Sequence, residues 1–152
     1  RENRELVFIG SELLKATLFN GWIPVLYGDM VFNLPDGTWA IASSELVIKE
    51  IAKSIPLNMI LVATDKDGVL KDVSKPDTVI STINRKSIDS IRKYLGASEH
   101  LDITGGMFAK VVNLYEVARI HGTPLHIFNG RIERLLLRSL SGDESFGTKI
   151  TN

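Results

Sequence analysis

The sequence predicts an α/β domain with a mostly parallel central sheet. Segments of strand length alternate with longer segments of helical periodicity, and glycine, proline or asparagine stands at most boundaries between them. The run from Met59 to Ala63 is apolar throughout, as is typical of a strand covered on both faces of a parallel sheet. With 152 residues and no internal repeat or linker, the chain fits a single domain.

The first segments predict a helix and a short strand. Apolar residues crowd together from Leu6 to Phe19, and Asn20-Gly21 ends this helix because both residues tolerate the left-handed conformation. Pro24 to Tyr27 then predicts a buried strand, which stops at Gly28-Asp29.

A hairpin and a second helix follow. Val31 to Leu34 and Thr38 to Ala42 flank the turn sequence Pro35-Asp36-Gly37, which predicts two antiparallel strands. Ser43-Ser44 supplies two candidate N-caps for a helix that runs to Ile55, because a serine hydroxyl accepts a hydrogen bond from a backbone N–H of the first turn.

The remaining elements continue the alternation. After the strand Met59 to Ala63, Thr64 to Gly68 predicts a loop at its carboxyl end, and Thr78 to Ser81 predicts a short strand or part of a hairpin. Asn84 can cap a helix that Gly96 closes. The last elements are a helix from Met107 to His121 ended by Gly122, a strand from Leu125 to Phe128, a helix around Ile132 to Leu140, and a closing strand from Gly147 to Ile150.

Composition and motif content exclude several classes of function. Lys and Arg together number 18 and balance 18 Asp and Glu, so no net field attracts nucleic acid or an acidic membrane surface. The absence of cysteine excludes disulfides, thiolate metal ligands and cysteine nucleophiles, and it fits a cytoplasmic protein. No apolar run is long enough to span a bilayer. There is no Walker-type loop, dinucleotide fingerprint or EF-hand, and the histidines lack metal-ligand spacing, so we expect no metal site built from protein side chains.

Three segments stand where α/β sheets bind ligands, at the carboxyl ends of strands and at helix N-termini. The first is Asp65-Lys66-Asp67-Gly68, directly after the most apolar strand. The second is Thr104-Gly105-Gly106-Met107, whose glycines let backbone N–H groups approach phosphate oxygens. The third is Lys110, in the first turn of the helix that these glycines open.

Each of these segments also has a plain structural interpretation. A lysine near a helix N-terminus opposes the macrodipole by roughly 0.3–1 kcal/mol, whereas beside a phosphate cradle it stabilises negative charge. Taken singly, Lys110 is a solvated surface residue, Gly105-Gly106 is a loop, and Asp65 to Gly68 is a turn.

Taken in order, the motifs resemble the amino acid kinase family. They are Tyr27-Gly28-Asp29, the hairpin, Ser43-Ser44-Glu45, Thr64-Asp65-Lys66-Asp67-Gly68, Asp102-Ile103-Thr104-Gly105-Gly106-Met107 with Lys110, Asn129-Gly130, and Gly147-Thr148-Lys149-Ile150. The aspartate ahead of Thr104, and the sequence Phe128-Asn129-Gly130, are more similar to isopentenyl phosphate kinases than to glutamate 5-kinases or uridylate kinases. The match runs from about Gly21 onward.

The resemblance implies a three-layer αβα fold of the carbamate kinase type and phosphoryl transfer from ATP, with Mg²⁺, to isopentenyl phosphate. The residues that would border the nucleotide are Thr64, Asp65, Asp67, Gly68, Gly105 and Gly106. Lys110 would stabilise the transferring phosphoryl group, and Glu45 would orient active-site lysines. Gly28 and Ser44 would meet the acceptor, a small-molecule phosphate. A homodimer is expected from the resemblance and from an unpaired sheet edge.

Two departures from the family pattern leave alternatives open. Where the family has serine-glycine-aspartate, this chain has Ser43-Ser44-Glu45. Ser44 and Glu45 either disturb the substrate phosphate site or serve as helix cap and first-turn acid. A homologue that binds nucleotide without transferring phosphate therefore stays open. A family kinase with another acceptor also stays open, because we expect most acceptor-binding residues to lie upstream of this sequence.

The second departure is at the N-terminal end. The family's glycine-rich N-terminal segment, with its lysine and substrate-binding histidine, does not occur in this sequence. We therefore expect these residues to be the C-terminal, nucleotide-binding part of one kinase domain, and to lack efficient activity alone.

Overall fold

The structure is a computed structural model that describes residues 10–33, 37–72, 74–95 and 106–152. The chain divides into two compact units, Arg1–Pro56 and Leu57–Asn152, and each is described by itself. In the described part of the chain, no helix has the length and apolar character needed to cross a membrane.

The first unit begins with helix α1, Ser11–Phe19, which follows the N-cap Gly10. The predicted end is confirmed, since Asn20 is the C-cap and Gly21 adopts a φ of 72°. The helix begins later than the predicted Leu6; residues 6–9 lie outside the described part of the chain.

The strand predicted over Pro24 to Tyr27 is wrong. These residues form no described strand, and Val25 and Tyr27 are 85% and 77% exposed within this unit. A strand requires a neighbour that pairs with its backbone and a surface that covers its side chains. The sheet that the structure describes in this unit has two strands, neither of which includes these residues.

The predicted hairpin and second helix are confirmed. Strands β1, Asp29–Asn33, and β2, Thr38–Ala42, pair antiparallel, with Phe32 opposite Trp39. Helix α2 spans Ser44–Ser54. Its N-cap is Ser43, whose hydroxyl accepts a hydrogen bond from the Leu46 N–H at 3.4 Å, so of the two candidate serines the first is the cap.

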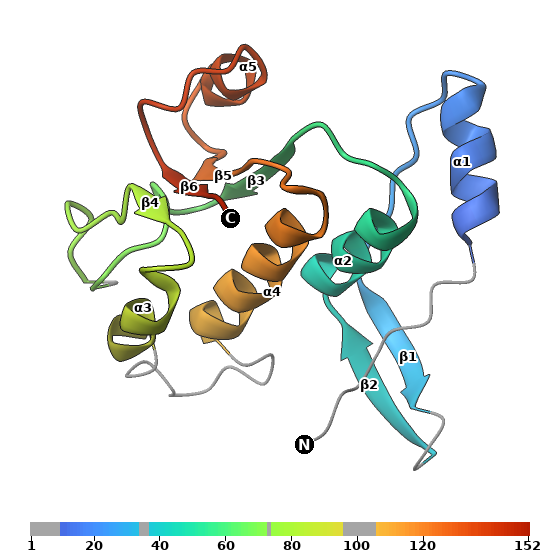
Figure 1. Cartoon of the computed structure of the whole chain (residues 1–152), viewed down its shortest axis with the longest axis horizontal. Coiled ribbons are helices and arrows are strands. Elements are labelled where there is room, and N and C mark those ends of the chain that lie inside the picture. The colour runs from blue at the N-terminus through green and yellow to red at the C-terminus, as the bar shows by residue number, and fades with distance from the viewer. Residues whose placement is uncertain (1–9, 34–36, 73, 96–105) are drawn as a thin grey trace. The chain divides into compact units, whose positions relative to one another are not determined.

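The second unit contains a four-stranded mixed sheet with the order β3-β5-β6-β4 (Figure 1). The strands are β3 Ile60–Thr64, β4 Thr82–Ile83, β5 Leu125–Asn129 and β6 Thr148–Ile150. β3 pairs parallel with β5 and β4 parallel with β6, whereas β5 and β6 are antiparallel. The mostly parallel sheet predicted from the sequence is therefore present.

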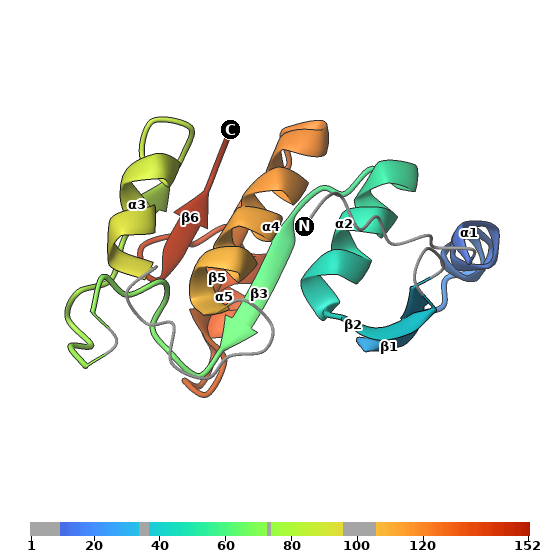
Figure 2. The same cartoon turned by 90° about the horizontal axis from the view of Figure 1, so that it is seen from below.

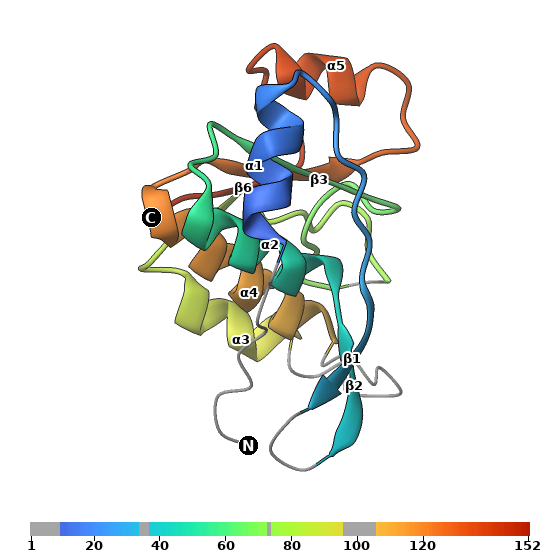
Figure 3. The ribbon, with the colours of Figure 1, turned by 90° about the vertical axis from the view of Figure 1, so that its right-hand side faces the viewer.

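Helices cover both faces of this sheet. Helices α3, Ile88–Leu95, and α4, Gly106–His121, lie on one face, and α5, Leu135–Leu140, lies on the other (Figures 1 and 3). The predicted three-layer αβα arrangement is thus confirmed. Helix α4 buries Val111, Leu114 and Ala118 fully, because this spacing places them on one face of a helix.

Several element boundaries differ from the predictions. Thr78 to Ser81 belongs to a hairpin, which was one of its two predicted alternatives, with an isolated bridge between Leu70 and Val79, and β4 follows it. Asn84 accepts hydrogen bonds from the N–H groups of the next turn, so it caps that turn and α3 begins at Ile88. Helix α5 is shorter than predicted because Arg134 adopts a left-handed φ of 66° just before it.

Candidate functional site

The carboxyl ends of β3 and β5 lie side by side. Thr64 pairs with Asn129 in the strand register, and the Gly130 N–H donates to the Thr64 carbonyl at 2.8 Å. A Cβ at Gly130 would stand 2.8 Å from the Ala63 Cβ, so only glycine fits there without a shift. Two loops, one after each strand, therefore leave the sheet from the same edge.

Thr64 shapes the first of these loops. Its hydroxyl donates to the Lys66 carbonyl at 2.9 Å and accepts from the Lys66 N–H at 3.2 Å. Such local side-chain hydrogen bonds define a turn. Asp65, Lys66 and Asp67 are exposed beyond this turn, and the Lys66 Nζ lies 3.4 Å from Asp65 Oδ2. Both carboxylates predicted to border a nucleotide thus stand at the surface at this sheet edge.

Asp67 is held from the neighbouring strand. The Asn129 Nδ2 donates to Asp67 Oδ1 at 2.8 Å, and Asn129 Oδ1 accepts from the Arg131 N–H at 3.0 Å. The hydrogen bond joins residues that are 62 positions apart in the sequence. Asn129 was assigned no site role from the sequence, and the signal that points to it is a polar side chain at the end of an apolar parallel strand.

Gly68 closes the loop against β6. Its φ is 147°, and a Cβ there would stand 2.6 Å from Thr148 Oγ1 and 3.0 Å from Val79 Cγ1. The same Thr148 hydroxyl, fully buried, accepts from the Val69 N–H at 2.8 Å. The loop is therefore fixed at both ends, by Thr64 at the start and by Thr148 at the finish.

Helix α4 presents its N-terminus at the same end of the sheet. It precedes β5 and runs antiparallel to it, so the N-terminal end of α4 lies toward the carboxyl ends of β3 and β5 (Figure 2). Lys110 is exposed and stands one turn into this helix. Gly105 and Thr104, which were predicted to complete a phosphate cradle, lie outside the described residues.

In the first unit, the predicted substrate residues gather at the start of α2. A Cβ at Gly28 would stand 2.5 Å from the Ala42 carbonyl oxygen and 3.2 Å from the Ser44 backbone nitrogen, so Gly28 lies directly against this junction. Ser44 is exposed as the first helical residue, and Glu45 is buried. The structure thus brings Gly28 and Ser44 together.

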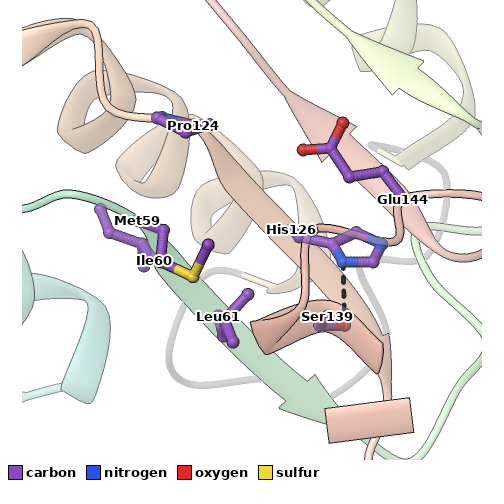
Figure 4. Close-up of a pocket in the computed structure, with 8 residues that line it drawn as sticks. Met59, Ile60, Leu61, Pro124, His126, Ser139 and Glu144 are labelled. Carbon is purple, nitrogen blue, oxygen red and sulfur yellow. Dashed lines mark hydrogen bonds between the residues drawn. The ribbon is translucent and has the colours of Figure 1, made fainter. Parts of the chain in front are cut away.

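A small pocket lies away from these residues (Figure 4). It is lined by the amino-terminal part of β3, by Pro124 and by His126 and Ser139, and its volume is about 20 Å³. That volume suits roughly one water molecule. His126 is buried, with Nδ1 3.1 Å from the Ser139 hydroxyl and Nε2 2.6 Å from the Phe146 carbonyl. The pocket therefore offers no room for a nucleotide.

Metal-ligating side chains do not cluster in the part of the chain that the structure describes. No group of three or more His, Cys, Asp or Glu residues there could hold a metal ion.

The sequence profile of the amino acid kinase family matches residues 1–129. This match covers most of the chain and decides its family. The chain belongs to the amino acid kinase family. The family resemblance inferred from the sequence is confirmed.

Individual relatives within the family include two from Methanocaldococcus jannaschii. An isopentenyl phosphate kinase is 32% identical over 146 residues, which are 96% of this chain and 52% of the relative. An acetylglutamate kinase is 32% identical over 150 residues, which are 97% of this chain and 46% of the relative. The chain thus spans about half the length of the relatives it matches.

Solved structures agree on the fold. An isopentenyl phosphate kinase superimposes with a TM-score of 0.69 at 24% identity, over 91% of this chain and 50% of the other. A carbamate kinase from Giardia lamblia gives a TM-score of 0.59 at 18% identity, over 96% of this chain and 45% of the other. At these identities, the likeness establishes the amino acid kinase fold.

Proposed function

We propose that this chain forms the nucleotide-binding part of an ATP-dependent kinase that phosphorylates isopentenyl phosphate. The observation that carries the proposal is the convergence of the loop Thr64 to Gly68 and the N-terminus of α4 at one end of the sheet. Helix N-termini and close backbone approaches favour bound phosphate. The isopentenyl phosphate kinase relative supports the choice of acceptor.

In this proposal the reaction joins two phosphates. An oxygen of the acceptor phosphate forms a bond to the γ-phosphorus of ATP, the bond from that phosphorus to the bridging oxygen breaks, and ADP and isopentenyl diphosphate leave. Such a transfer depends on positioning and charge stabilisation more than on covalent chemistry. Mg²⁺ bound with ATP would neutralise phosphate charge.

The chain's own residues would then act by position and charge. Thr64, Asp65, Asp67 and Gly68 border the nucleotide in this proposal, and the backbone N–H groups of Gly105 and Gly106 meet its phosphates. Lys110 supplies a positive charge to the transferring group, and Glu45 orients lysines of the active site. Gly28 and Ser44 meet the acceptor phosphate, consistent with their proximity at the start of α2. A cytoplasmic homodimer is part of the same proposal.

Two observations favour other functions, and these functions should be tested beside the proposed phosphorylation of isopentenyl phosphate. The acetylglutamate kinase relative is as similar as the isopentenyl phosphate kinase, which favours a kinase with another small acceptor. Ser44-Glu45, at a position where the family pattern has glycine-aspartate, favours a homologue that binds nucleotide without transferring phosphate.

The deciding experiment is ADP release by the full-length gene product, with isopentenyl phosphate compared with acetylglutamate, glutamate, UMP and fosfomycin. We expect turnover with isopentenyl phosphate alone. Turnover with a different acceptor would reassign the substrate, and ATP binding with no turnover would establish the non-transferring homologue. Lys110→Ala should lower kcat by about 10²–10³-fold, as loss of a transition-state charge contact does. Lys15→Ala, a change of the same kind on the exposed side of α1, is the matched control.

A further inference from the structure

Asn129 has both ends of its side-chain amide engaged. Its Nδ2 donates to Asp67 Oδ1 at 2.8 Å, and its Oδ1 accepts from the Arg131 N–H at 3.0 Å. A carboxylate only accepts and a backbone N–H only donates, so the chemistry of the two partners fixes which way the amide faces. Asn129 therefore has a single arrangement that satisfies all of these groups.

This arrangement supports the middle of the loop between β3 and Val69. Thr64 fixes the start of the loop at Lys66, and Thr148 fixes its end at Val69. The bond from Asn129 reaches Asp67, between those two anchors, from the neighbouring strand. A loop that is already ordered loses less conformational freedom when a ligand binds to it, so such an anchor raises affinity without any contact to the ligand.

We propose that Asn129 is a positioning residue for nucleotide binding, which acts by holding Asp67 and with it the loop Thr64 to Gly68. The inference rests on the proposed function for the identity of the ligand. Asn129 acts through the loop and takes no part in the transfer. Its loss should therefore raise the Kd and KM for ATP and leave kcat nearly unchanged.

The test is a double-mutant cycle in the full-length gene product. Asn129→Asp keeps the acceptor for Arg131 but removes the donor to Asp67 and places two carboxylates face to face. Asp67→Asn restores a donor and acceptor pair in the double variant. Asp67 is itself predicted to border the nucleotide, so its substitution alone can change the Kd. The change in Kd caused by Asn129→Asp is therefore measured twice, once in the native protein and once in the Asp67→Asn variant.

We expect Asn129→Asp to raise the Kd for a non-hydrolysable ATP analogue about tenfold when Asp67 is present, the size expected for one lost charge-assisted hydrogen bond. In the Asp67→Asn background the same substitution should change the Kd less than about twofold. Equal effects in both backgrounds, or no effect with Asp67, would overturn the proposal.

Hydrogen exchange gives a readout that does not depend on the ligand. Asn129→Asp should speed exchange of the Lys66 and Val69 amides, and Asp67→Asn should reverse this. If the wild-type protein binds no ATP, the proposed function fails. Hydrogen exchange then still tests Asn129 separately: unchanged exchange of the Lys66 and Val69 amides in Asn129→Asp would exclude Asn129 as a loop anchor. Asn84→Asp is the matched control, since it adds the same charge while keeping the acceptor for Lys86 and Ser87.

Discussion

The two compact units differ in how far their large apolar side chains are buried. In Leu57–Asn152, large residues such as Phe128, Leu114 and Leu125 are almost completely buried. In the described part of Arg1–Pro56, Phe19, Trp22 and Ile23 are 92%, 71% and 89% exposed. An apolar sequence thus leads to a packed element only where the same unit supplies the surface that covers it.

The polar groups follow the same division. At the carboxyl end of β3, Thr64 orders the loop through local hydrogen bonds with Lys66, and Asn129 at the end of β5 donates a hydrogen bond to Asp67 of the same loop. At the start of α2, the hydroxyl of Ser43 is used in capping its own helix. The second unit therefore carries a candidate site whose shape its own contacts define.

The largest test of this comparison is to remove one aromatic ring from each unit. Phe128→Ala should destabilise the protein by about 3–5 kcal/mol, because it leaves a cavity in a packed core. Phe19→Ala should change stability by less than about 0.5 kcal/mol, because the ring is exposed. Urea unfolding of both variants measures the difference. A large loss from Phe19→Ala would show that this ring is covered in the full-length protein, and the comparison would then fail.

Much of the fold follows from the sequence because its signals are local. The hairpin follows from Pro35-Asp36-Gly37, the α2 cap from serine, and the end of α4 from Gly122. The strand prediction for Pro24 to Tyr27 was wrong because a strand depends on a partner strand, which no local sequence pattern specifies. The order β3-β5-β6-β4 was equally out of reach, since pairing is a property of the assembled sheet.

The candidate site divides in the same way. Asp65, Asp67 and Gly68 were predicted from their place after an apolar strand and Thr64 from the family resemblance, and the structure puts all four at that sheet edge. Asn129 and Thr148 were not assigned to the site, because they meet the loop only after distant strands have come together. Their roles therefore depend on tertiary contacts that spacing along the chain does not reveal.

A second test asks how tightly the second unit is packed at its turns. Gly147 and Gly142 both have positive φ, 73° and 84°, but a Cβ at Gly147 would stand 2.3 Å from the Ile127 carbonyl oxygen, and one at Gly142 would meet open space. Gly147→Ala should therefore cost at least about 2 kcal/mol, and Gly142→Ala about 1 kcal/mol from the backbone conformation alone. Equal losses in urea unfolding would indicate that the close approach at Gly147 relaxes freely.

A smaller effect is expected in the first unit, at the cap of α2. Ser43→Ala should lower stability by about 1 kcal/mol, because it removes the acceptor for the Leu46 N–H. Ser43→Asp keeps an acceptor at this position and serves as the control. Thermal unfolding followed by circular dichroism measures both variants. If the alanine and aspartate variants unfold at the same temperature, the side-chain cap does not contribute to stability, and other contacts hold the start of α2.

The smallest effect is a pH dependence at Asp143, on the surface of the second unit. Hydrogen bonds from the side chain and backbone of Ser145, and then from Arg138, lower the pKa of Asp143 to about 2. Because the pKa is lowered on folding, the contribution is complete above the ordinary carboxyl pKa and is lost as the pH falls toward about 2.

Asp143→Asn provides the comparison for this effect, since the amide does not titrate. Wild type should be slightly more stable than the variant near pH 7, and the difference should shrink between about pH 4 and pH 2. Unfolding midpoints of both proteins across this range measure it. A difference that stays constant with pH would mean that Asp143 stabilises the turn by shape rather than by charge. The charge on Asp143 would then contribute little to the stability of this part of the second unit, and the geometry of its hydrogen bonds would account for the effect.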